Sequence, residues 1–138
     1  MENAESELLS KFKIQFSGQY DPYDEFNCVN KFRIALVIAY RNRSNNLIAF
    51  LRHMHPFLIR QMLTYGIYLV EPIDGLEFNR GLLMNIGFIE SVKDSHSKWN
   101  CYFFHDVDTL PERLDNYYTC DPNLPIHYAR AVSKLKYK

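Results

Sequence analysis

Glycine is scarce in this sequence, with 5 residues among 138, and none of them belongs to a glycine-rich stretch. The chain therefore lacks the glycine loop whose backbone N–H groups wrap nucleotide phosphates in many binding proteins. Any phosphate must therefore be bound by a few side chains at one place in the fold. No serine or cysteine lies in the context of a nucleophile elbow, which argues against a hydrolase of that type.

The sequence also lacks an excess of charge of either sign, because 16 basic residues balance 16 acidic ones. A neutral chain has no electrostatic footprint for nucleic acid or an anionic membrane, so we expect no nucleic-acid partner. No apolar run reaches the roughly 18 to 20 residues that span a bilayer. Met1 to Glu7 are polar and acidic rather than the basic start of a signal peptide, so the sequence itself carries no secretion signal.

Cysteine is rare as well, and the three present, Cys28, Cys101 and Cys120, leave one unpaired if the other two form a disulfide. The odd number points to a partner cysteine outside this chain, whereas three buried, reduced thiols of a cytosolic protein are an equally open interpretation. Aromatic residues are abundant, with ten Tyr and ten Phe. Together with a length of 138 residues and 47% hydrophobic content, they indicate one packed globular domain.

Three apolar segments predict strands. Phe32 to Ala39 is rich in β-branched residues and nearly continuous in apolar character, which is typical of a strand buried on both faces of a parallel sheet. Gly66 to Glu71 predicts a second strand, which a proline and an Asp-Gly turn end. Cys101 to His105 predicts a third.

Apolar residues at helical spacing fill the two intervals between these strands. The first predicted helix follows Ser44, which can cap it, and Pro56 kinks or restarts it. The second starts near Asn79. The alternation of strand and helix predicts an α/β fold with a doubly wound, mostly parallel sheet, preceded by an irregular lead-in over residues 1–27.

The most informative segment is the end of the third strand, where the apolar run stops abruptly at Asp106-Val107-Asp108. Ligands of α/β sheets collect beyond the carboxyl ends of the strands. A hard divalent cation that bridges the protein to a diphosphate needs carboxylate oxygens at that place. The plainer alternative is a pair of aspartates that opens a turn, helped by Pro111.

Polar clusters also follow the other two strands, namely Arg41-Asn42-Arg43 and, after a short loop, Phe78-Asn79-Arg80. If the strands are parallel, all three clusters lie at one edge of the sheet. Guanidinium groups hydrogen-bond phosphate oxygens in a fixed fork, and a helix that begins at Asn79 adds its positive end. Each arginine alone is more often a solvated surface charge, but together the clusters predict a site for a nucleoside diphosphate and a metal ion.

Further motifs occur in a fixed order along the chain. They are Cys28, Phe32 to Ala39, Arg41-Asn42-Arg43, Leu51 to Leu58, Tyr65-Gly66-Ile67-Tyr68, Phe78-Asn79-Arg80, Asn85-Ile86-Gly87-Phe88 and Phe104 to Glu112. In this combination and spacing the chain, from about Phe16 to its last residue, resembles the amino-terminal half of the catalytic domain of the β-1,4-galactosyltransferase family.

The resemblance implies a nucleotide-diphosphate-sugar-binding, GT-A-like half-domain over residues 28–138. Members of this family are Golgi type II membrane enzymes that use manganese to transfer galactose, or in some members N-acetylgalactosamine, from UDP to a terminal sugar with inversion. This chain would then act on the lumenal side of the Golgi with a UDP-sugar donor and a glycan acceptor of a glycoprotein or glycolipid. It would reach the membrane only through an anchor missing from this chain.

The resemblance also implies roles for individual residues. Asp108 would be a manganese ligand, and Asp106 would contact the ribose of the donor. The residues that would surround the UDP-sugar are Tyr40, Arg41, Arg43, Phe78, Arg80, Asp106, Val107 and Lys134. Cys101 and Cys120 match a family disulfide, and Cys28 matches a second one whose other half would lie upstream of Met1.

Two departures from the family pattern matter. Ala39-Tyr40 stands where the family usually has Pro-Phe, which keeps a ring near the uracil site but loses the fixed φ of proline. The chain also stops at Lys138, where the family continues into a Trp-Gly-x-Gly-Gly-Glu-Asp-Asp segment that binds the acceptor and supplies the general base. No catalytic residue is therefore assigned to this chain.

Three hypotheses about the molecule follow. We expect a part of a galactosyltransferase that carries the UDP and manganese side only and has no transfer activity of its own. One alternative is a catalytically inactive nucleotide-sugar-binding or regulatory fragment, and another is a pseudogene product without function. Because parallel strands need cover on both faces, we also expect exposed apolar surface on the isolated chain.

Overall fold

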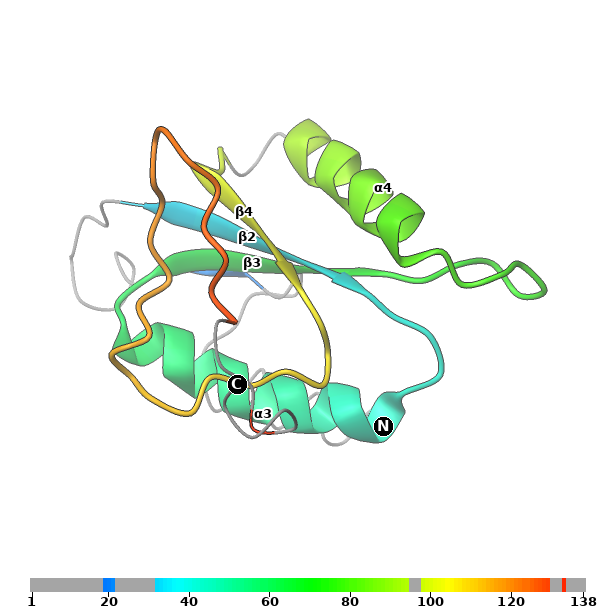
Figure 1. Cartoon of the computed structure of the whole chain (residues 1–138), viewed down its shortest axis with the longest axis horizontal. Coiled ribbons are helices and arrows are strands. Elements are labelled where there is room, and N and C mark those ends of the chain that lie inside the picture. Colours follow the sequence, from blue (N-terminus) through cyan, green and yellow to red (C-terminus); the bar gives the residue numbers. More distant parts are fainter. Residues whose placement is uncertain (1–18, 22–31, 95–97, 130–132, 134–138) are drawn as a thin grey trace.

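The computed structural model describes residues 19–21, 32–94, 98–129 and 133. Their strands form one sheet in the order β1-β3-β2-β4. Strands β2, β3 and β4 run parallel, and β1 pairs with β3 antiparallel (Figure 1). The elements are β1 (Gln19–Tyr20), β2 (Arg33–Ala39), α3 (Ser44–Arg60), β3 (Thr64–Val70), α4 (Arg80–Lys93) and β4 (Cys101–His105).

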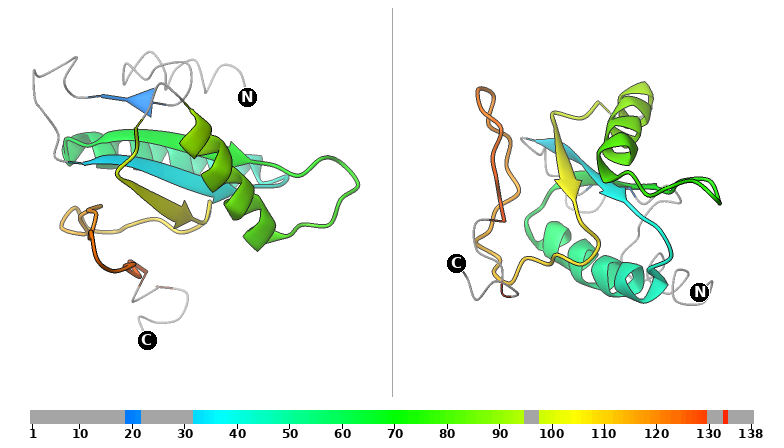
Figure 2. Two further views of the ribbon diagram at one scale, coloured as in Figure 1. Left: turned by 90° about the horizontal axis from the view of Figure 1, so that it is seen from above. Right: turned by 45° about the vertical axis from the view of Figure 1, so that its right-hand side comes forward.

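The two helices cover opposite faces of the sheet (Figures 1 and 2). Successive side chains of β2 point to opposite faces, so this central strand contributes to both cores. The core on the α3 side includes Ile34, Leu36, Ile38, Phe50, Met54, Leu58 and Tyr65. The smaller core on the α4 side consists of Ala39, Leu83 and Met84, with Val70 packed against it. Neither helix of the described residues has the length and apolar character of a membrane span.

The predicted strands and their parallel arrangement are confirmed. Strand β4 has the predicted bounds, β2 starts one residue later than predicted, and β3 starts two residues earlier. One element was missed: within the predicted irregular lead-in, Gln19 and Tyr20 form a short strand that pairs with Gly66 and Tyr65. This strand forms because Tyr20 packs against Tyr65. The two ring centroids lie 5.6 Å apart, and Tyr20 is only 3% exposed. The rest of residues 1–27, apart from Asp21, lies outside the described part of the chain.

The predicted cap of the first helix was wrong, whereas that of the second is confirmed. Ser44 is the first residue of α3, and Arg43 occupies the N-cap position without a side-chain cap hydrogen bond. The helix starts this early because the Leu47 N–H donates to the Arg43 carbonyl, 2.9 Å away. At α4, the Asn79 side chain accepts from the Leu82 N–H at 3.0 Å, as expected of an N-cap.

Pro56 neither ends nor restarts α3, which is continuous from Ser44 to Arg60. A proline inside a helix removes one hydrogen bond and crowds the preceding turn. The helix persists because the residues on both sides of Pro56 are buried, with Met54 and Leu58 fully covered by the sheet. Tertiary packing therefore outweighs the local cost of the proline.

Helix α4 lies against the sheet at Gly87, and this contact yields a prediction. A Cβ atom at Gly87 would fall 2.5 Å from Val37 Cγ1 and 2.6 Å from Val70 Cγ2, closer than packed carbon atoms come. We expect Gly87→Ala to lower the free energy of unfolding by about 2 kcal/mol, because the helix or the valines must shift. Urea unfolding followed by circular dichroism measures this change.

The control is Gly81→Ala in the first turn of the same helix. A Cβ at Gly81 would meet only the Asn79 side chain, at an ordinary 3.6 Å. Alanine favours a helix over glycine by about 1 kcal/mol, so Gly81→Ala should be neutral or stabilising. Equal unfolding midpoints for the two variants would contradict the close packing at Gly87.

His55 is a buried histidine that ties α3 to β3. Its Nδ1 lies 2.6 Å from the Tyr65 hydroxyl, in the core beneath the sheet. Burial lowers the pKa of His55 from 6.5 to about 4, because the charged imidazolium loses its water. The unfolded chain therefore binds this proton at a higher pH than the folded chain does.

We expect the folded state to lose stability as the pH falls from 6.5 toward 4, with a loss from His55 of about 2 kcal/mol near pH 5. Burial also lowers the pKa of His105, which adds a loss of the same sign. Urea midpoints across this pH range should fall less steeply in His55→Gln than in wild type. A wild-type slope in His55→Gln would refute the assignment.

Candidate functional site

The carboxyl ends of β2, β3 and β4 lie next to one another at one edge of the sheet. The register pairs Ala39 at the end of β2 with Val70 at the end of β3, and Ile38 with His105 at the end of β4. The chain passes from β2 to β3 on one side and returns to β4 on the other, so the strand order reverses at β2. Ligands of α/β folds bind at such a reversal.

Two ion pairs join the segments that follow these strands. Arg43 Nη1 lies 2.9 Å from Asp108 Oδ2, and Arg80 Nε lies 2.8 Å from Asp106 Oδ1. The four side chains are between 46% and 56% exposed, so water screens both pairs. Surface pairs of this kind contribute roughly 0 to 1 kcal/mol each, which means that a charged ligand can replace them at little cost.

Arg41 points to a different partner from Arg43. Its Nη1 donates to the Leu76 carbonyl at 2.7 Å, and its guanidinium lies 5.2 Å from the centroid of the Phe78 ring. The intervening Asn42 has a φ of 49°, a left-handed conformation that asparagine adopts more readily than most residues. This turn separates the two arginines and lets one reach the loop after β3 and the other the loop after β4.

The structure therefore brings together six of the predicted donor and metal residues, namely Arg41, Arg43, Phe78, Arg80, Asp106 and Asp108. Two others have buried side chains: Tyr40 is 8% exposed and Val107 is 4% exposed, and both belong to the core on the α3 side. The Tyr40 ring thus packs inward. Lys134 and Cys28 lie outside the described residues.

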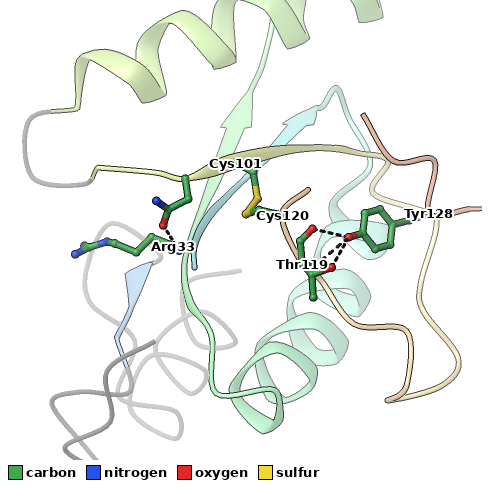
Figure 3. The surroundings of a disulfide bond; sticks show 6 residues. Arg33, Cys101, Thr119, Cys120 and Tyr128 are labelled. Atoms are coloured by element: carbon green, nitrogen blue, oxygen red, sulfur yellow. Dashed lines mark hydrogen bonds between the residues drawn. A yellow bond between two sulfur atoms is a disulfide. The ribbon is translucent and has the colours of Figure 1, made fainter. Parts of the chain in front are cut away.

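The disulfide that the resemblance implied is present between Cys101 and Cys120, with the two Cα atoms 5.8 Å apart (Figure 3). It ties the segment after Asp108 to the start of β4. Beside it, the Tyr128 hydroxyl donates to the Thr119 carbonyl at 2.6 Å (Figure 3). A groove of about 1270 Å³ runs along β4, and its lining includes Arg80, Asp106, Asp108 and much of residues 109–129.

The family described as the N-terminal region of glycosyl transferase group 7 matches residues 1–121 of this chain. The chain belongs to glycosyl transferase group 7. It is 41% identical over 125 residues to β-1,4-galactosyltransferase 3 of Rattus norvegicus, covering 91% of this chain and 30% of that protein. It is 42% identical over 132 residues to β-1,4-galactosyltransferase 5 of Sus scrofa, covering 95% and 32%. The group 7 chain thus spans about a third of the length of these curated relatives.

The fold of this chain is also similar to that of solved galactosyltransferase structures. A mutant Drosophila β-1,4-galactosyltransferase 7 in complex with manganese, UDP-Gal and xylobiose superimposes with a TM-score of 0.60 at 31% identity, over 67% of this chain and 37% of that one. The catalytic domain of Drosophila β-1,4-galactosyltransferase 7 with xylobiose gives the same values. The GT-A-like α/β fold predicted for the group 7 chain is therefore confirmed.

The candidate metal ligands of this chain, Asp106 and Asp108, suit a hard cation such as manganese. Carboxylate oxygens are the protein ligands that Mn²⁺ prefers, and Asp106 and Asp108 offer them at the edge of the groove. Within residues 19–21, 32–94, 98–129 and 133, no group of three or more His, Cys, Asp or Glu side chains could hold a metal ion. The remaining ligands would have to be phosphate oxygens, water or residues beyond this part.

Sequence reasoning missed two side chains, one on α3 and one directly after it, that hold the segment after Asp108. Nε2 of His53 lies 2.8 Å from the Pro111 carbonyl oxygen. The Gln61 amide donates to the Leu114 and Asn116 carbonyls at 3.2 and 3.1 Å. No sequence pattern predicts these contacts, because each joins a side chain to a backbone atom more than fifty residues away.

Proposed function

We propose that this chain is the donor-binding part of a β-1,4-galactosyltransferase and binds UDP-galactose, or UDP-N-acetylgalactosamine, together with Mn²⁺. The observation that carries this proposal is the pairing of Arg43 with Asp108 and of Arg80 with Asp106 at the carboxyl ends of the parallel strands. Arginines and carboxylates in one exposed place are what a diphosphate and its cation require. The β-1,4-galactosyltransferase relatives supply the reaction class.

In this proposal the ion pairs exchange partners when the donor binds. Arg43 and Arg80 would turn from the aspartates to the diphosphate, Asp108 would hold the metal, and Asp106 would accept from the ribose hydroxyls. The metal would supply positive charge beside the diphosphate leaving group. The other donor contacts are assigned to Tyr40, Arg41, Phe78, Val107 and Lys134, with the buried Tyr40 and Val107 acting through their backbone atoms.

The acceptor in this proposal is the terminal sugar of a glycan, and the general base lies outside this chain. Residues 28–138 form the donor-binding unit. We place the protein on the lumenal side of the Golgi, as a type II membrane protein. The Cys101–Cys120 disulfide supports an oxidising compartment.

Calorimetric titration of the chain with UDP, with and without Mn²⁺, tests the proposal. We expect saturable binding of one UDP per chain that Mn²⁺ strengthens and that CDP and GDP do not reproduce. Zn²⁺ serves as a control cation of softer character. Binding of all three nucleotides alike, or none of UDP, would count against a donor site.

A second candidate is a catalytically inactive module that binds a nucleotide sugar and pairs with another protein. The observation that favours it is the apolar outer side of α4, where Leu82, Ile89 and Val92 are 55%, 50% and 53% exposed. This exposed apolar surface was expected from the sequence. Both candidates bind UDP with Mn²⁺. Sedimentation of the chain mixed with a full-length homologue separates them. A stable complex favours the module, and two species that sediment separately favour the donor-binding part.

A further inference from the structure

His105 connects the end of β4 to a residue of the following loop. Its Nδ1 lies 2.9 Å from the carbonyl oxygen of Asp106, and its Nε2 lies 2.8 Å from the Tyr118 hydroxyl oxygen. A carbonyl oxygen can only accept a hydrogen bond, so Nδ1 carries the proton and donates it. In the neutral ring, Nε2 then accepts from the Tyr118 hydroxyl. The hydroxyl of Tyr118 thus orients the ring that fixes the peptide of Asp106.

Tyr118 is itself held from several sides. Its ring is 3% exposed and stacks on Phe103 and Tyr128, with centroids 4.8 and 5.6 Å apart. Its backbone N–H donates to the side chain of Gln61, directly after α3, at 3.1 Å. Cys120, two residues later, is bonded to Cys101 at the start of β4. The hydroxyl is therefore presented to His105 by an anchored segment.

The same short stretch carries both carboxylates of the candidate site. Val107 is buried in the core, whereas the aspartates on either side of it are about half exposed and reach Arg80 and Arg43. Once the Asp106 carbonyl and the Val107 side chain are both fixed, the directions of the two carboxylates follow. Metal sites depend on such outer contacts, because they set the orientation of the ligands before the ion arrives.

We propose that His105 and Tyr118 are positioning residues, which fix the backbone at Asp106 so that the carboxylates of Asp106 and Asp108 face the donor and its cation. This inference rests on the proposed function. In this inference both residues, which also line the groove, act through the Asp106 backbone rather than by contact with the ligand. The hydrogen bond from Tyr118 to His105 makes the affinity for UDP with Mn²⁺ depend on a hydroxyl in the core.

Tyr118→Phe tests this, because it removes one oxygen atom and keeps the stacked ring. We expect its affinity for UDP in the presence of Mn²⁺ to fall about tenfold, while metal-free UDP affinity stays within about twofold. In a His105→Gln background, Tyr118→Phe should cause no further loss, because the two residues act as one unit. A loss of fold would lower both affinities together and would not show this dependence on His105.

The matched control is Tyr128→Phe, which removes a hydroxyl from the same aromatic stack. Tyr128 bonds to Thr119 rather than to His105, so Mn²⁺-dependent affinity should stay at the wild-type value. Equal affinities for wild type and Tyr118→Phe would overturn the inference and leave the proposed function standing. Equal losses in Tyr118→Phe and Tyr128→Phe would also overturn it.

Amide hydrogen exchange of the ligand-free chain gives a readout that does not depend on UDP. The Thr109 N–H donates to the Asp106 carbonyl at 3.2 Å, so we expect faster exchange at Thr109 in Tyr118→Phe. Exchange in β3 should be unchanged, and Tyr128→Phe should show no such effect. If wild type binds no UDP, the proposed function is wrong, and this exchange result alone decides whether the pair orders the segment. Unchanged exchange in Tyr118→Phe would overturn the inference in every case.

Discussion

Asp108→Ala is expected to remove the manganese-dependent part of UDP binding, with an affinity loss of about tenfold or more in the presence of Mn²⁺. The carboxylate is the proposed metal ligand, and alanine offers no oxygen in its place. The same change frees Arg43, whose Nη1 lies 2.9 Å from Asp108 in the ligand-free chain. Metal-free UDP affinity should therefore stay the same or increase, because the released guanidinium can meet a phosphate.

The matched control is Asp115→Ala. Asp115 is an exposed aspartate paired with Arg113 at 2.6 Å, as Asp108 is paired with Arg43, and it follows Asp108 in the same segment. Its removal should leave UDP affinity unchanged with and without Mn²⁺. Isothermal titration under both conditions measures all four values. A uniform drop in Asp108→Ala, independent of the metal, would argue for a charge effect without metal ligation.

Loss of the disulfide is expected to have the largest effect on stability. The double variant Cys101→Ser, Cys120→Ser lacks the bond that closes a loop between two residues 19 positions apart. Closing a loop of this size restricts the unfolded chain enough to stabilise the fold by about 3 kcal/mol, so the variant should lose about that amount. Urea unfolding of oxidised chain, reduced chain and double variant measures the loss.

The single variant Cys28→Ser is the control, because Cys28 takes no part in this bond. It should unfold at the wild-type urea concentration, and reduction should destabilise it as much as it destabilises wild type. The reduced wild type and the double variant should coincide. A double variant as stable as the oxidised wild type would show that the bond adds nothing to the fold.

The strands and the clustering of the candidate site residues could be predicted because both depend on short-range patterns. Phe32 to Ala39 is so uniformly apolar that only a strand covered on both faces accommodates it. Once the strands are parallel, the residues that follow them lie at one edge, and the contacts of Arg43 with Asp108 and of Arg80 with Asp106 follow from that geometry.

What the sequence did not reveal depends on contacts between distant segments. Strand β1 is two residues long and exists because Tyr20 packs on Tyr65, which no local pattern encodes. Tyr40 lies among the predicted donor residues, yet its ring is buried in the core. The bond between His105 and Tyr118 requires the loop after Asp108 to fold back onto β4.

The place of β4 in the sheet has a practical consequence. It stands at one end of the strand order, and among the strands described only β2 pairs with it. An edge strand is a template on which another chain can add a strand. The edge borders the groove that contains Asp106 and Asp108, so self-association there would hide the site. Binding experiments on this chain should therefore be made at low protein concentration and repeated at several dilutions, so that an occluded dimer is not mistaken for an inactive protein.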